Sequence, residues 1–298
     1  MSTAIELVAA GLANGAAYAL IALGFVIIYR ASEIFNFAHG EFLTIGVFSM
    51  VTLIDLGLPW AVALLGAMVM TGLVGAGVER AVIRPMIGRP VFVTIILTIF
   101  VAYILRAAVV IALGAKSGGI PTPWSPLGSV ELGGAYISYN WIACLVASLI
   151  SLLAYFLLIR YSRIGVAMRA TSADQEVALV LGIPVGRVFG TTWFLAGVYA
   201  ALAGVFLAIF GRGYDLNLGY AALAAFPAVI VGGLNSPTGT VIAALGLGVF
   251  SKLVESYVSP ELGTFGAGFH VVAPYLVMIL FLMVRPYGLL GAREVERV

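Results

Sequence analysis

The side chains best placed to hold a charge or a proton lie in the stretch NFAHGEF, residues 36–42. Asn36, His39 and Glu41 of this stretch stand directly before a long apolar run. One interpretation is a helix start, with Asn36 as the N-cap and Glu41 in the first turn, where negative charge suits the helix dipole. The other is a polar element facing the interior of a helix bundle, because ionisable groups in apolar spans face a partner or a cavity. The two interpretations are compatible.

Arg106 is a second candidate, because it lies in VAYILRAAVV with apolar neighbours on both sides. A charge at that depth is costly, so its side chain must pair, face a cavity or reach toward an interface. We expect either a structural ion pair, for which Glu41 is one conceivable partner, or a place on a transport path. The candidate residues of a translocation path are therefore Asn36, His39, Glu41 and Arg106.

Other chemistry-bearing patterns are missing from the sequence. The phosphate-binding pattern G-x-x-x-x-G-K-[ST] is absent, and GAKSGG around Lys116 differs from it because Ala115 precedes the lysine. Cys144 is the only cysteine, which excludes an intrachain disulfide and a cysteine-rich metal site. We therefore expect no enzyme and no cofactor bound by this chain, and any ATP hydrolysis must come from another polypeptide.

The elements that must position these residues are membrane spans. Of the 298 residues 62% are hydrophobic and 9% are charged, whereas an average soluble domain is about 45–50% apolar. Several apolar runs reach the roughly 20 residues that a helix needs to cross a bilayer. The sequence predicts an all-α integral membrane protein with a single transmembrane domain over 1–298. Its eight or nine transmembrane helices are expected at about 5–29, 37–56, 59–79, 92–115, 138–159, 188–210, 219–234, 238–258 and 269–284.

The seventh run, 219–234, decides between eight and nine crossings. It is short and contains Pro227, so it either crosses as a broken helix or turns back as a re-entrant segment. A re-entrant segment would also reverse the side on which the N-terminus lies.

Basic residues give the orientation, because cytoplasmic loops carry an excess of Lys and Arg. Arginines concentrate in 79–91, in 160–187 and in the tail 285–298, whereas 116–137 contains only Lys116. We expect the three arginine-containing segments in the cytoplasm and 116–137 outside. The distribution favours nine crossings with an outside N-terminus.

The stretch TSADQEVALVLGIP, residues 171–184, predicts a short helix from Ala173 to Leu181 inside the polar loop 161–187. Ser172 can serve as its N-cap, and Gly182 followed by Pro184 supplies a stop. Such a helix is too short to cross a membrane.

The faces of this short helix differ. Ala173, Val177, Val180 and Leu181 share one face, and the acids cluster in the first turn. A helix lying on lipid is disfavoured, because it contains two acids and no base for anionic headgroups. An apolar face kept on a polar loop fits insertion into a groove of a partner protein.

Glycines mark a turn in VGGLNSPTGT, between the seventh run and the next one. Gly232, Gly233, Asn235 and Gly239 can all take a positive φ, which predicts a tight turn, with a moving hinge as the alternative. Further along, Lys252 and the glutamate at position 255 are three residues apart and predict an ion pair on one helix face.

Five stretches together resemble the LivH-type permease subunits of ATP-binding-cassette importers for branched-chain amino acids. They are NGAAYALIALGFVIIY, NFAHGEF, RYSRIGVAMRATSADQEVALVLGI, VGGLNSPTGT and RPYGLLGAREVERV, and they cover nearly the whole length. NFAHGEF and the central block are specific together, whereas the glycine motif is shared with sugar permeases. One departure is Asn235, which stands where the motif has glycine.

This resemblance implies a set of partners and roles. The partners would be a second, LivM-type permease, two cytoplasmic ATPase subunits that use ATP and Mg, and an external substrate-binding protein. The location would be the inner membrane of a bacterium or archaeon. No nucleic-acid partner is expected. The substrates would be branched-chain amino acids, or urea, short amides or aromatic acids as in related permeases. The 173–181 helix would be the coupling helix, with ATPase-coupling residues Arg163, Arg169, Asp174, Glu176, Val177, Leu181 and Gly182.

Two other functions stay open at this point. A self-sufficient secondary transporter would use His39, Glu41 or Arg106 as a proton or ion relay, and predicts an inverted repeat between the halves of the chain. A passive channel predicts uptake that is independent of ATP.

Overall fold

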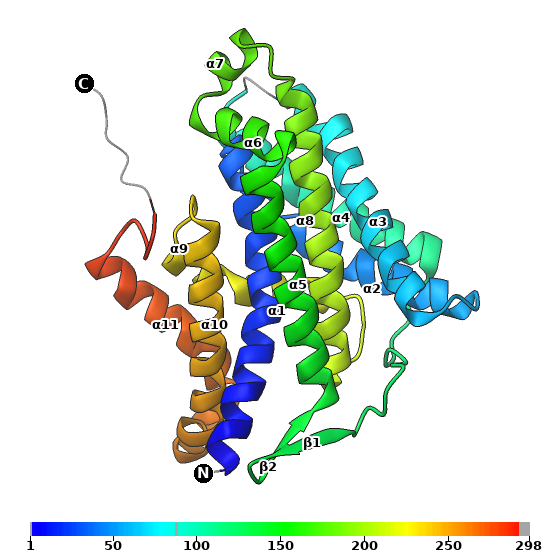
Figure 1. The fold of residues 1–298 in the computed structure, drawn as a ribbon, viewed down its shortest axis with the longest axis vertical. Coiled ribbons are helices and arrows are strands. Elements are labelled where there is room, and N and C mark those ends of the chain that lie inside the picture. The colour runs from blue at the N-terminus through cyan, green and yellow to red at the C-terminus, as the bar shows by residue number, and fades with distance from the viewer. Residues whose placement is uncertain (1, 87–88, 292–298) are drawn as a thin grey trace.

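The computed structural model describes residues 2–86 and 89–291, and these form a bundle of long helices (Figure 1). The tail residues Arg293 and Arg297, expected in the cytoplasm, lie outside the described residues. The α-helices are α1 (Ser2–Ser32), α2 (His39–Asp55), α3 (Trp60–Val78), α4 (Val91–Leu113), α5 (Tyr139–Tyr161), α6 (Arg163–Ala173), α7 (Gln175–Val180), α8 (Val185–Leu207), α9 (Phe226–Gly232), α10 (Pro237–Leu253) and α11 (Phe269–Val284).

Shorter π- and 3₁₀-helical segments extend or join these helices. They are η1 (Glu79–Ile83), η2 (Arg84–Met86), η3 (Ala208–Arg212), η4 (Leu218–Ala225), η5 (Val254–Val258) and η6 (Pro260–Gly266). Each of the nine predicted apolar runs contains helix. In the described part of the chain six helices are long and apolar enough to cross a membrane, or seven if η6 and α11, which meet at a 94° bend, form one span. The all-α membrane architecture is confirmed, but the count of eight or nine crossings is not, because α2 and the seventh run are too short.

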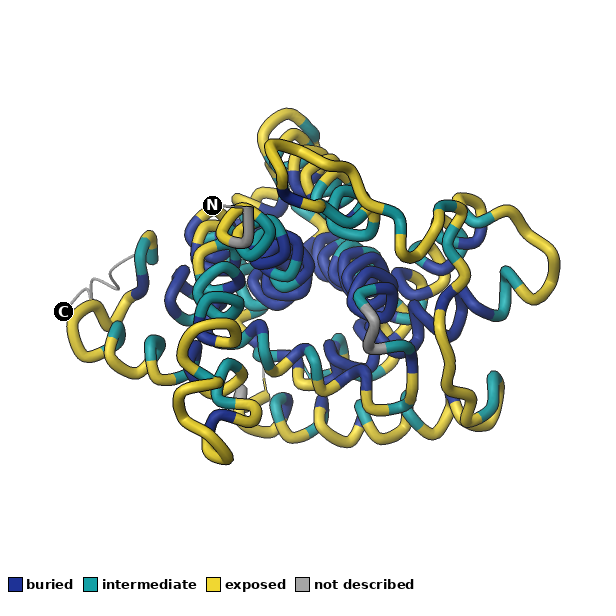
Figure 2. The backbone as a smooth tube through the Cα atoms, turned by 90° about the horizontal axis from the view of Figure 1, so that it is seen from below, coloured by how far each residue is buried: buried dark blue, intermediate teal, exposed yellow. Residues whose placement is uncertain are grey.

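Helices α1 and α8, together with the shorter α2, form the centre of the bundle. In the most apolar stretches of α1 and α8, 83% and 78% of the residues are buried, against 17% to 33% for the other candidate spans. Figure 2 shows the same division, with buried backbone in the middle and exposed backbone around it. The outer helices therefore present apolar faces to lipid or to another protein chain.

A β-hairpin interrupts the all-α pattern and was not predicted. Strands β1 (Ser129–Leu132) and β2 (Ala135–Ser138) pair antiparallel, and Gly133 and Gly134 between them have φ of 61° and 80°. Two glycines with positive φ form the two-residue turn that suits a twisted hairpin. Glu6 Oε1 accepts a hydrogen bond of 2.7 Å from the Tyr136 backbone N–H, which ties the hairpin to the start of α1.

The hairpin and the predicted coupling segment lie at opposite ends of the molecule (Figure 1). We call the end with α6 and α7 the coupling end and the other the hairpin end. The predicted topology places 116–137 and 160–187 on opposite sides of the membrane, and the separation of these two segments agrees with it.

The short helix in the coupling segment exists as α7, Gln175–Val180, but it is shorter than the predicted Ala173–Leu181, Ala173 belongs to α6, and the predicted N-cap was wrong. Helix α6 continues through Ser172, whose hydroxyl donates to the Arg169 carbonyl at 3.0 Å. Asp174 caps α7 instead, because its Oδ1 accepts from the Val177 N–H at 2.9 Å. Gly182, with φ of 80°, ends the segment as predicted.

The glycine-rich turn is also present, but most of the residues predicted to take a positive φ do not. Of the four predicted positions only Gly233, with φ of 103°, takes a positive φ. Gly232 and Gly239 are helical and bring α9 against α10, since a Cβ on Gly239 would lie 2.2 Å from the Gly232 carbonyl oxygen. Asn235 is exposed and keeps the turn without a positive φ.

Candidate functional site

Helix α2 begins deep inside the bundle rather than at its surface. After α1 ends, the chain turns back, and Glu33 has the only positive φ of a described residue other than glycine, 57°. His39, the first residue of α2, is fully buried, and its Nε2 donates to the Ile21 carbonyl of α1 at 3.1 Å. Ile21 lies about 11 residues before the end of α1, or about 16 Å at 1.5 Å per residue.

A second interrupted segment meets α2 at this depth. The seventh run forms the 3₁₀ segment η4 and then α9, with Pro227 in the first turn of α9, where its missing N–H costs no hydrogen bond. Gly40 of α2 and Gly219 of η4 touch through their backbones, since a Cβ on Gly40 would lie 2.5 Å from the Gly219 carbonyl oxygen. Interrupted helices that meet within a membrane are a common setting for transport sites.

Asn36 and His39 have structural positions in this arrangement. Asn36 is not the N-cap of α2: the cap position is Ala38, and Asn36 Oδ1 accepts from the Ala38 N–H at 3.0 Å, closing the turn before the helix. The ring of His39 packs 4.4 Å from that of Phe25, and a Cβ on Gly24 would lie 2.4 Å from its Cε1 atom. A buried, hydrogen-bonded and tightly packed imidazole is typical of a core residue.

Glu41 and Arg106 line one cavity of about 250 Å³, which we call the central cavity. It lies between α2, α4 and η4, and its aromatic lining residues are Phe25, Phe37, Tyr103, Tyr220 and Phe226. A cavity of about 150 Å³ in another protein holds benzene. The central cavity therefore has room for a ligand of more than six non-hydrogen atoms.

The ion pair expected for Arg106 does not form among the described residues. Its guanidinium donates to the Leu216 carbonyl at 2.6 Å, to Asn217 Oδ1 at 2.8 Å and to the Tyr220 hydroxyl at 2.8 Å, and it lies 4.9 Å from the Tyr220 ring centre. All these partners are neutral. Glu41 is 7% exposed, and its Oε2 has no hydrogen-bond partner.

A larger cavity of about 970 Å³, the hairpin-side cavity, lies on the other side of η4. Tyr220 and Leu223 line both cavities, so η4 forms the wall between them. The larger cavity contains the predicted pair Lys252 and Glu255, which is confirmed with an Nζ–Oε2 distance of 2.6 Å. Sequence analysis missed His270 and Tyr220. For Tyr220 the available signal was the stretch DLNLGY, residues 215–220, which overlaps the start of the seventh run.

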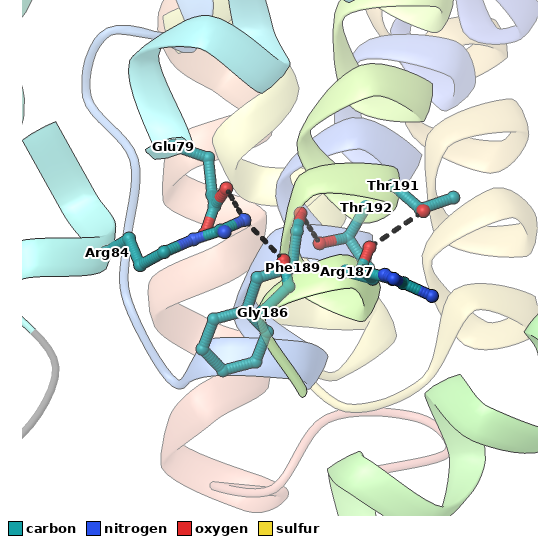
Figure 3. A network of polar contacts seen from close by, with 7 residues as sticks. All are labelled: Glu79, Arg84, Gly186, Arg187, Phe189, Thr191 and Thr192. Carbon is teal, nitrogen blue, oxygen red and sulfur yellow. Dashed lines mark hydrogen bonds and ion pairs between the residues drawn. The ribbon is translucent and has the colours of Figure 1, made fainter. Parts of the chain in front are cut away.

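The coupling end contains an arginine–glutamate pair that the sequence analysis counted only as loop charge. Glu79 is fully buried and accepts two hydrogen bonds from Arg84, at 3.0 Å and 2.7 Å (Figure 3). Arg84 also donates to the Gly186 carbonyl at 2.6 Å. These contacts join the end of α3 to the start of α8, whereas the side chain of Arg187 points away from them (Figure 3).

Helix α7 contacts the bundle through Ala178 and through Gln175, whose Nε2 donates to the Ala31 carbonyl at 3.2 Å, and leaves its larger apolar residues uncovered. Ala178 is buried against a cluster that includes Phe189 of α8. Val177, Val180 and Leu181 are 52%, 87% and 72% exposed. The other predicted coupling residues are exposed as well, namely Arg163, Arg169, Asp174, Glu176 and Gly182.

Long apolar helices beside two open cavities define a multi-pass membrane permease. Residues 7–284 match the family described as the permease component of the branched-chain amino acid transport system, and the chain belongs to this family. The predicted resemblance is thereby confirmed.

Individual relatives match over almost the whole chain. The high-affinity branched-chain amino acid transport system permease proteins LivH of Escherichia coli and BraD of Pseudomonas aeruginosa are each 31% identical, over 97% of this chain and 96% of theirs. A probable branched-chain amino acid transport permease protein LivH of Methanocaldococcus jannaschii is 25% identical over 91% of this chain and 88% of its own. The structure of PsaBC from Streptococcus pneumoniae in complex with Fab shares the fold, with a TM-score of 0.51 at 11% identity over 93% of this chain and 91% of that one.

Proposed function

We propose that this chain is the transmembrane permease subunit of an ATP-binding-cassette importer that moves branched-chain amino acids. The observation that carries the proposal is the near-complete alignment with LivH and BraD. Urea, short amides and aromatic acids are the other substrates to test. An external binding protein delivers the substrate to the hairpin end.

The other subunits follow from the same proposal. A second, LivM-type permease covers part of the exposed apolar surface, and two cytoplasmic ATPase subunits hold ATP and Mg. The relatives come from two bacteria and an archaeon, which supports a cytoplasmic (inner) membrane of such an organism as the location. The exposed apolar faces of the outer helices support burial in lipid and against this partner.

The coupling end supplies the contact with the ATPases. Helix α7 exposes Val177, Val180 and Leu181, which a groove on an ATPase subunit would bury. Arg163 and Arg169, exposed beside it, pair with acids of that subunit. Arg84 then passes movement of the loop to α3, because it holds both Glu79 and the Gly186 carbonyl.

Substitution of Val177 and Leu181 by Asp tests this contact. We expect the double variant to insert and fold, because both side chains are more than half exposed, but to lose its ATPase subunits or substrate-stimulated hydrolysis at least tenfold. Co-purification and ATPase rates in proteoliposomes measure this. The matched control is Leu56→Asp, a 74% exposed position between α2 and α3. Normal coupled uptake by the double variant would refute the assignment.

Transport itself is tested in proteoliposomes containing the chain with its neighbouring subunits. We expect uptake of leucine, isoleucine and valine only with ATP on the ATPase side and the binding protein on the other. Uptake by the chain alone would support a secondary transporter or a channel and would exclude the importer.

A further inference from the structure

The central cavity contains a carboxyl group and a guanidinium that do not form an ion pair with each other. Glu41 is only 7% exposed, and its Oε2 has no hydrogen-bond partner. Arg106 binds only neutral acceptors, and no described carboxylate pairs with it. A buried carboxyl oxygen without a partner, like that of Glu41, is costly, so it persists where a ligand or a reaction uses it, and the partly exposed Arg106 lines the same cavity.

We propose that the central cavity is an intramembrane binding site for a zwitterionic α-amino acid with an apolar side chain. Arg106 binds the ligand's carboxylate, Glu41 binds its ammonium group, and the aromatic lining contacts its side chain. This inference rests on the proposed function, since it assigns the substrate of that importer to a place in this chain.

Arg106 is held in position for a carboxylate. Its three hydrogen bonds all go to η4 and to the residues just before it, and the Tyr220 ring lies against its guanidinium. These bonds use one N–H of Nη1 and the N–H groups of Nη2, so Nε and the rest of Nη1 remain for a ligand. Because both N–H groups of Nη2 are taken, neither bidentate face of the guanidinium is free, and a ligand carboxylate would accept single hydrogen bonds from Nε or Nη1.

Glu41 supplies the opposite end of the site. It stands in the first turn of α2, next to the Gly40–Gly219 contact, so its backbone is fixed relative to η4. An ammonium group donates three hydrogen bonds and has a full positive charge, which matches a carboxyl oxygen without a partner.

The rest of the lining selects an apolar side chain. Ile99, Ala102, Ala222, Leu223 and Phe226 contribute apolar surface to the cavity. The volume of about 250 Å³ accommodates the eight or nine non-hydrogen atoms of valine or leucine, by comparison with the roughly 150 Å³ that holds benzene.

Other small solutes fit the charges less well. Urea and short amides have no full charge, so binding them would leave both Glu41 and Arg106 unpaired. A simple amine or a simple acid would compensate only one of the two. Only a zwitterion pairs both groups at once, and a site built for a buried polar contact rejects ligands that lack it.

The central cavity lies next to the hairpin-side cavity, so a ligand could pass from one to the other in two steps. The wall between the two cavities is η4, a 3₁₀ segment, and Tyr220 on this wall is itself bonded to Arg106. A ligand carboxylate that binds Arg106 therefore acts directly on the segment that separates the two spaces.

The test measures ligand binding by cysteine protection in the assembled complex. The chain carries Cys144→Ala, which removes its only cysteine, and Ala102→Cys in the cavity lining. Ile99→Cys is the second labelling position in case the first variant does not fold. We expect leucine to slow labelling by N-ethylmaleimide, and 4-methylpentanoate or 3-methylbutylamine, which each lack one charge, to need about 10- to 100-fold higher concentrations.

Substitution of the two charged residues completes the test. Glu41→Gln and Arg106→Gln are each expected to raise the leucine concentration for half-protection about 10- to 100-fold. The matched control is Asp55→Asn, because Asp55 is the last residue of the same helix and is 60% exposed. No protection by leucine, or protection unchanged in both variants, would overturn the site whatever the uptake assay gives. Absence of ATP-driven uptake with intact protection would instead overturn the proposed function and leave the site standing.

Discussion

Two arginine–glutamate sets in this molecule are built in opposite ways. At the coupling end, Arg84 and Glu79 are joined by two hydrogen bonds, and Arg84 also binds the Gly186 carbonyl. In the central cavity, Arg106 and Glu41 share one space without forming a pair, and each keeps hydrogen-bonding capacity. The first set is complete within the chain, whereas the second is completed by a ligand.

The difference separates a structural role from a binding role. A buried carboxylate that already has a bidentate guanidinium has little left for a ligand, but its partner cannot be removed without cost. Removal of a carboxyl group without a hydrogen-bond partner breaks no hydrogen bond and should therefore cost little stability. The two sets should therefore respond to substitution in opposite ways, one in stability and the other in binding.

The largest expected effect on stability is that of Arg84→Ala. This change leaves the fully buried Glu79 without its guanidinium, and because Arg84 itself is 35% exposed we expect a cost of about 3 kcal/mol, the lower end of the range for buried pairs. Thermal unfolding in detergent should show a large decrease in Tm. The double variant Glu79→Leu, Arg84→Met should recover most of the loss, because it removes the stranded charge. A single variant as stable as the parent would mean that the pair is not structural.

The next largest effect is expected at the Gly40–Gly219 backbone contact, which fixes α2 and thus Glu41 relative to η4. Gly40→Ala would put a Cβ 2.5 Å from the Gly219 carbonyl oxygen, so α2 and η4 must separate, at about 1–3 kcal/mol. We expect a lower Tm together with weaker ligand protection. The matched control is Gly190→Ala beside Glu79, where the new Cβ lies at an ordinary 3.4 Å from Oε2 and removal of a helix glycine should leave Tm unchanged or higher. Equal responses of the two variants would contradict the comparison.

The smallest expected effect on stability is that of Glu41→Gln. The replaced Oε2 has no hydrogen-bond partner, and a neutral amide removes the cost of an unpaired buried charge, so Tm should stay the same or rise by no more than the equivalent of about 1 kcal/mol. The same unfolding measurement as for Arg84→Ala applies. A large decrease in Tm would show that Glu41 is structural after all, and would remove the contrast between the two sets.

Local signals in the sequence predicted the helices and the residues at which some of them end. Each apolar run contains helix, Gly182 and Gly233 end their helices, and the Lys252–Glu255 pair forms, because all of these depend on neighbours within a few residues. One local prediction was wrong. Ser172 was predicted as the cap of the short helix, but α6 extends through Ser172, and Asp174 takes the role instead.

Contacts between distant residues could not be read from the sequence. Arg106 is bonded to residues 110 to 114 positions away, and Arg84 to Gly186 at 102 positions. The same holds for the depth at which α2 begins, since it depends on His39 packing against α1. The candidate residues Glu41 and Arg106 were found because their types are rare in apolar runs, but their arrangement without a pair required the fold.

The close packing of α1 against α10 has a consequence for biosynthesis. A Cβ on Gly11 would lie 2.6 Å from the Val249 Cα atom, and one on Gly248 would lie 2.4 Å from the Gly15 Cα atom, so the two backbones are in contact. Roughly 200 residues separate the two helices, and at about 5–20 residues per second the ribosome needs about 10–40 s to make them. During that time the first helix is in the membrane without its final neighbour, and its glycine face must be covered by lipid, by the insertion machinery or by a helix that later gives way.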